Sequence, residues 1–273
     1  MKNQVVASLL VVVASIAVNA AAIPLVFSRG LAWLATPLGL VAQVPFLVVI
    51  ALLVRLVLRR FRGLDTAALG VAPLATARAI APLVVGLAFP VVAAGALVLK
   101  GHGTFTPASL DAGLVGALVV GALSTAVNAA LQDVTLVGLA LAASSSTSRV
   151  TRGAFAVSVA FFVFGHLPVS QAPVYVVNVA LFGALALLFF EPASTTRSFL
   201  STVAFHTGTN VSFVFFIGSP TTEGVTSLLG LTGTDETWSG GAAGLESGAV
   251  LVVVYAILLA ALLVYRRRRA ARA

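Results

Sequence analysis

Long apolar runs, separated by short polar segments, constrain this chain more than any other feature. A run of about 20 apolar residues is long enough to cross the hydrocarbon core of a bilayer as an α-helix. Such runs lie near residues 5–27, 37–58, 80–99, 112–143, 153–172, 173–190, 197–217 and 248–265. Because lipid offers no water to exposed backbone groups, each run is expected to be helical. The sequence therefore predicts an all-α polytopic membrane bundle of about eight transmembrane helices.

The composition excludes an ordinary soluble domain. Apolar residues make up 60% of the 273 residues and charged residues only 9%, whereas about 25% of a soluble domain is charged. The first run, preceded by Lys2 and followed by small residues, also resembles a secretory signal peptide. It continues through Pro24 to Phe27, which gives it spanning length, so an uncleaved first helix is the preferred interpretation. The chain contains no cysteine, which excludes disulfides and thiolate chemistry.

The formal charge of +8 indicates a membrane rather than a nucleic acid as partner, because most basic residues lie in short segments between the apolar runs. Assigning these segments by the positive-inside rule places thirteen of the sixteen basic residues on one side, which is then the cytoplasm. Both termini are expected there, in a multi-pass protein of the cell membrane. The 218–247 segment, which has acidic residues and no basic residue, is expected outside. Arg outnumbers Lys fourteen to two, as in GC-rich prokaryotes.

Few polar side chains interrupt the apolar runs, and such groups mark a functional interior by default. They are Asn128, Gln132, Asp133, His166, Asn178, His206 and Asn210. Asp133 and His166 are equally far from the turn near residues 149–150, each about 25 Å along its helix, so they can face each other. His206 and Asn210 are one helical turn apart on one face.

Two imidazoles and an amide or carboxylate oxygen are a plausible site for Zn or a similar divalent metal ion, with a position open for water. The alternative is that these histidines and amides only hydrogen-bond across helices and hold the bundle together. His102, which lies between two runs, is expected to be solvated.

The same residues, taken in order, resemble the CPBP family of intramembrane metalloproteases, which includes CAAX prenyl endopeptidases and bacteriocin-processing enzymes. That family has Glu-Glu-x-x-x-Arg-Gly, then Phe-x-x-x-His, often followed by Leu-Pro, then His-x-x-x-Asn or Asp. This chain has Gln132-Asp133-x-x-x-Val137-Gly138, then Phe162-x-x-x-His166-Leu167-Pro168, then His206-x-x-x-Asn210. The second and third motifs match fully, whereas the first is degenerate.

The resemblance implies that His166 and His206 hold the metal and that Asn210 adds an oxygen ligand or stabilises the oxyanion. Asp133 would orient or activate the water. Gln132 stands where the family has its first Glu, the general base, and Gln cannot accept a proton at physiological pH. Val137 stands where the family has Arg.

On this basis the chain divides into transmembrane helices at 1–110, a CPBP-like protease core at 111–217, an outer loop at 218–247, and a last helix with a basic cytoplasmic tail at 248–273. The expected function is a metalloendopeptidase, a hydrolase that cleaves membrane-associated peptides or protein C-termini. The main alternative is a non-catalytic member of the same fold that acts as a membrane scaffold or peptide-binding protein. A small-solute transporter fits less well, because the chain has no repeated halves or paired broken helices.

Overall fold

The structure is a computed structural model that describes residues 36–60, 76–144, 152–166, 172–190, 198–218 and 227–271, and individually residues 6, 10, 13, 16–18 and 33. The predicted first span, 5–27, therefore lies largely outside the described residues. The helices are α3 (Pro37–Arg60), α4 (Thr76–Leu99), α5 (Ala112–Ser144), α6 (Arg152–His166), α7 (Pro173–Phe190), α8 (Phe199–Val211), α9 (Glu236–Ser239) and α10 (Ala249–Ala270). A π-helical turn, η1 (Ser212–Ile217), extends α8, and two short 3-10 turns, η3 (Gly241–Ala243) and η4 (Leu245–Ser247), precede α10.

The protein is helical and has the character of a membrane protein, as the apolar runs predicted. Five described segments are long and apolar enough to cross a membrane: Ala79–Leu99, Ala112–Val137, Pro173–Phe190, Phe199–Ile217 and Ala249–Arg268. Two shorter apolar helical segments, Pro37–Leu53 and Arg152–His166, accompany them. The predicted 112–143 run is a single 33-residue helix, α5, which at 1.5 Å per residue is about 50 Å long and exceeds the roughly 30 Å hydrocarbon core.

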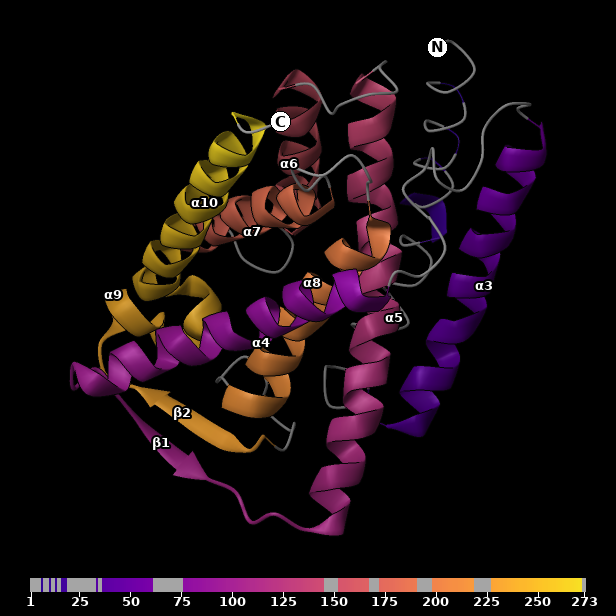
Figure 1. The fold of residues 1–273 in the computed structure, drawn as a ribbon. Helices are drawn as coiled ribbons and strands as arrows, with labels where there is room; N and C mark the ends of the chain where they lie inside the picture. Colours follow the sequence, from indigo (N-terminus) through magenta and orange to yellow (C-terminus); the bar gives the residue numbers. More distant parts are fainter. Residues whose placement is uncertain are drawn as a thin grey trace.

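Helix α8 lies inside the bundle, with α4, α5 and α7 packed around it (Figure 1). Two glycines allow α4 and α8 to approach closely. A Cβ atom on Gly86 would lie 2.3 Å from the carbonyl oxygen of Phe205, and one on Gly208 would lie 2.4 Å from that of Leu83. Since backbone atoms cannot move aside as a side chain can, only glycine fits at this crossing.

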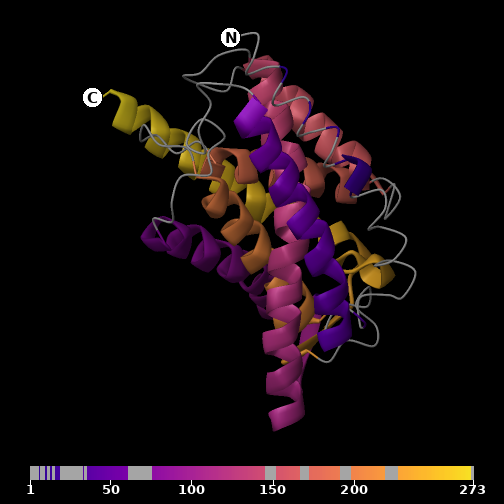
Figure 2. The same ribbon diagram turned by 90° about the vertical axis from the view of Figure 1, so that its right-hand side faces the viewer.

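Helix α3 runs alongside α5 (Figure 2). A buried polar pair joins them, because the Gln43 amide of α3 donates a hydrogen bond to the Ser124 hydroxyl of α5 and another to the carbonyl of Gly39. Gln43 was not among the polar residues that the sequence singled out. It illustrates the interhelical hydrogen bonding that membrane bundles use for packing.

The structure also contains a small antiparallel sheet that the sequence did not predict. Strand β1 (Gly103–Pro107) pairs with β2 (Leu229–Gly233), with Gly103 opposite Gly233 and Pro107 opposite Leu229. Both strands were expected to be loop. The pairing joins two segments far apart in the sequence, at the end of the bundle opposite the C-terminal end of α10 (Figure 1). The connection between α4 and α5, which contains β1, and the connection between η1 and α9, which contains β2, therefore lie at the same end of the helices.

Candidate active site

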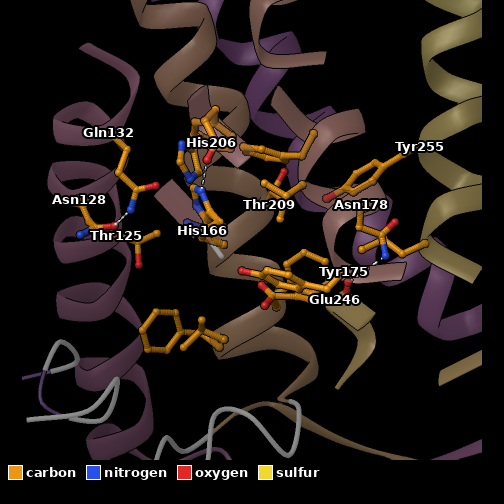
Figure 3. A pocket seen from close by; sticks show the side chains of 18 residues that line it. Thr125, Asn128, Gln132, His166, Tyr175, Asn178, His206, Thr209, Glu246 and Tyr255 are labelled. Atoms are coloured by element: carbon orange, nitrogen blue, oxygen red, sulfur yellow. Dashed lines mark hydrogen bonds between the residues drawn. The ribbon is translucent and has the colours of Figure 1, made fainter. Parts of the chain in front are cut away.

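Four of the five predicted site residues line one cavity of about 190 Å³, which is bounded by α5, α6, α7, α8, η1, η4 and α10. They are Gln132, His166, His206 and Asn210. Figure 3 shows the two histidines at the centre, with Asn128 and Gln132 of α5 on one side and Glu246 beside Tyr175 on the other. The cavity has room for several water molecules.

Asp133, the fifth predicted residue, lies behind His206. Its Oδ1 is 3.0 Å from His206 Nδ1, and both side chains are buried, with 0% and 3% of their surface exposed. Asp133 is not among the residues that line the cavity. The sequence placed Asp133 and His166 at matching depth so that they could face each other, but the partner that Asp133 contacts is the histidine of α8.

His166, at the C-terminal end of α6, is oriented by its own helix. Its Nδ1 lies 2.7 Å from the carbonyl oxygen of Phe162, one turn earlier. A carbonyl oxygen only accepts hydrogen bonds, so Nδ1 carries the hydrogen, and the lone pair of the neutral ring is at Nε2. The carboxylate of Asp133 selects the same tautomer in His206. Both rings are thus left with Nε2 as the atom able to bind a metal or accept a proton.

The rings of Phe162 and Phe182 pack against the two imidazoles. The ring of Phe162 lies 4.4 Å from that of His166 and 6.2 Å from that of His206, centroid to centroid. Phe182 of α7 meets His206 edge-on at 4.8 Å. Phe162 therefore contacts the histidines in two ways. Its carbonyl oxygen contacts Nδ1 of His166, and its ring lies against the rings of His166 and His206.

Two amides of α5, Gln132 and Asn128, form a hydrogen-bonded pair on the cavity wall. Gln132 Nε2 donates a 2.7 Å hydrogen bond to Asn128 Oδ1, one turn earlier on α5. Gln132 Oε1 is buried and has no hydrogen-bond partner among the described residues. At this position the cavity wall therefore offers polar atoms but no group that accepts a proton.

The candidate donors for a divalent metal are two imidazoles and one amide that line the same cavity. Among the described residues, no three His, Cys, Asp or Glu side chains are grouped so that they could hold one ion. A metal site here would instead draw on His166, His206 and Asn210, which line one cavity. Each imidazole has its Nδ1 engaged by an acceptor, Asp133 or the Phe162 carbonyl. Metal-binding histidines almost always have such a partner.

Sequence reasoning missed Glu246, which it grouped with the other acids of the outer segment. Its side chain lines the cavity opposite α5. Burial raises the pKa of its carboxyl group, and the nearby His206 opposes that rise. The sequence carries no signal for this placement beyond the glycines around Glu246, which indicate a turn.

The third histidine lies away from the cavity. His102 Nδ1 is 3.6 Å from Asp235 Oδ2, and both side chains are about one-third exposed. Asp235 also caps α9 by accepting hydrogen bonds from the backbone of Thr237 and Trp238.

Comparison of the chain with models of protein families, with characterised proteins and with solved structures finds no match.

Proposed function

We propose that the protein is an intramembrane metalloendopeptidase of the CPBP type that cleaves membrane-associated peptides or protein C-termini. The observation that carries the proposal is the pair of histidines on one cavity, His166 and His206, each with Nδ1 engaged by an acceptor so that the lone pair of the neutral ring is at Nε2. The ordered motifs that supply them add support. The proposal includes about eight transmembrane helices and two cytoplasmic termini.

Under this proposal His166 and His206 hold a divalent metal, probed first as Zn²⁺, with Asn210 as an oxygen donor. Such an ion polarises a peptide carbonyl and lowers the pKa of water. Asp133 keeps His206 in the tautomer that presents Nε2 and stabilises positive charge on the ring. The aromatic rings of Phe162 and Phe182 exclude water from the flanks of the imidazoles.

The decisive experiment is metal analysis of the purified protein, with cleavage of an internally quenched peptide mixture in liposomes. We expect about one metal ion per wild-type chain and none in His166→Ala. The matched control is His102→Ala, which removes the histidine that lies outside the cavity. Equal metal content in all three proteins would refute the proposed metal site.

A non-catalytic peptide-binding scaffold is the second candidate, favoured by the Gln132–Asn128 amide pair in place of a carboxylate. Gln132→Glu separates the two, because it places a proton acceptor on α5. The new charge costs at least about 2.5 kcal/mol unless it is paired or faces water. A protease that has no other base on the cavity should gain activity, whereas one with a base elsewhere on the cavity should keep the activity it has. Adding Val137→Arg is not useful, since Val137 packs in the apolar core. If folded wild type and Gln132→Glu both cleave nothing, the scaffold becomes the better explanation.

The orientation is tested separately. Ala243 is exposed in η3 and belongs to the 218–247 segment, which we propose lies outside the cell. A cysteine introduced there, in a chain that has none, should react with an impermeant thiol reagent in intact cells. Reaction only after permeabilisation would reverse the orientation.

A further inference from the structure

Glu246 enters the cavity from an unexpected part of the chain. It lies in η4 (Leu245–Ser247), between the sheet and α10, more than thirty residues after the last motif residue. Its side chain nevertheless lines the cavity together with His166 and His206, as Figure 3 shows. The three motifs alone do not account for this residue.

The backbone around Glu246 is held in place by hydrogen bonds and by the burial of neighbouring residues. Asn178 of α7 donates a 2.8 Å hydrogen bond to the Glu246 carbonyl and a 3.2 Å one to the Gly248 carbonyl. Leu245, the preceding residue, is fully buried in the core. Gly240 and Gly244 both have positive φ, and a Cβ on Gly240 would lie 2.0 Å from the Gly244 carbonyl oxygen. This compact, glycine-dependent fold brings the segment back onto the bundle.

The other acidic candidate is already engaged. Asp133 contacts His206 through Oδ1 and does not line the cavity, and Gln132 is an amide. Of the described residues that line the cavity, Glu246 is the one that carries a carboxylate. The group that motif one lacks is therefore present on the opposite wall.

We propose that Glu246 is the general base of this site, an inference that rests on the proposed peptidase function. The Glu246 carboxylate takes a proton from a water molecule as the water oxygen bonds to the carbonyl carbon of the substrate. When the C–N bond breaks, the carboxyl group returns that proton to the leaving amine. The products are one carboxylic acid and one amine, and water is the only co-reactant.

The test compares Glu246→Gln and Glu246→Asp with wild type in the liposome peptide assay, alongside metal analysis. The matched control is Glu236→Gln, which removes an exposed acid ten residues away on α9. A positioned base contributes about 10²- to 10⁴-fold in rate. We expect a loss of that size in Glu246→Gln, a smaller loss in Glu246→Asp, wild-type metal content in both, and wild-type rate in the control.

A second readout does not depend on activity. In Glu246→Cys, Zn²⁺ should slow the reaction of the single thiol with a small methanethiosulfonate reagent, and it should not slow the reaction of Glu236→Cys. Equal labelling of Cys-substituted position 246 with and without Zn²⁺ would overturn the placement.

The failures are distinguishable. An active wild type with an equally active Glu246→Gln overturns the role of Glu246 alone. Loss of metal together with activity in Glu246→Gln overturns the base assignment, because a base leaves the ligands intact. A folded, metal-loaded wild type that cleaves nothing overturns the peptidase function and the role of Glu246 with it.

Discussion

Helix α8 with its η1 extension and helix α10 are both long and apolar enough to span a membrane, yet they occupy opposite environments. Of an 18-residue stretch within Phe199–Ile217, 72% of the residues are buried inside the protein. For the matching stretch within Ala249–Arg268 the buried share is 22%. The α8 segment carries His206, Gly208 and Asn210, whereas α10 before its four C-terminal arginines is aliphatic apart from Tyr255 and Tyr265. The comparison teaches that apolar content brings a helix into the bilayer, while small and polar residues place it at the centre of the bundle.

The largest expected effect comes from the polar face of α8. His206→Ala removes one of two proposed imidazole ligands, so metal content should fall to near zero. Peptide cleavage should fall by more than the 10- to 100-fold that a residue supporting a ligand contributes. Metal analysis and the peptide assay measure both quantities. Unchanged metal content in folded His206→Ala would show that α8 is polar for packing alone.

The residue that supports His206 comes next. Asp133→Asn replaces the carboxylate that accepts the His206 Nδ1 hydrogen bond with a neutral amide. Metal affinity should therefore fall by about 10- to 100-fold. Competition against a chelator of known affinity measures it. A larger loss in cleavage than in metal affinity would indicate that Asp133 itself handles a proton.

A smaller, purely structural effect tests the close crossing of α4 and α8. Gly208→Ala places a Cβ against the Leu83 carbonyl, and overpacking of this kind costs about 1–3 kcal/mol. The control is Gly116→Ala on α5, where a Cβ meets no atom within 4 Å. Thermal unfolding in detergent should separate the two. Equal stability of both variants would mean that α4 can slide on α8.

The smallest effect is expected on α10. Ile257 is 64% exposed to the surroundings of the bundle, where lipid replaces its few protein contacts. Ile257→Ala should change the free energy of unfolding by less than about 0.5 kcal/mol and leave metal content unaltered. A loss of 2 kcal/mol or more would reveal an unrecognised partner on this face and would weaken the contrast with α8.

The sequence alone determined the helical membrane character of the protein and most helix bounds, because burial in lipid demands long apolar runs with satisfied backbones. It also singled out His166, His206, Gln132 and Asn210, since polar groups are few in such runs. That these four residues line one cavity depends on how their helices pack, which the sequence suggested but did not determine. The chemical roles of these residues stay predictions.

Only the tertiary structure decided which groups meet across helices. Matching depth suggested Asp133 with His166, but helix rotation, which depth along a helix does not specify, pairs Asp133 with His206. The β1–β2 sheet was invisible because two short loop segments gain their strand character from pairing with each other. Glu246 looked like any acid outside the spans, and it reaches the cavity because glycine turns and the Asn178 hydrogen bonds fold its segment back onto α7. Contacts between residues distant in the sequence depend on how whole elements pack, and no local pattern records that.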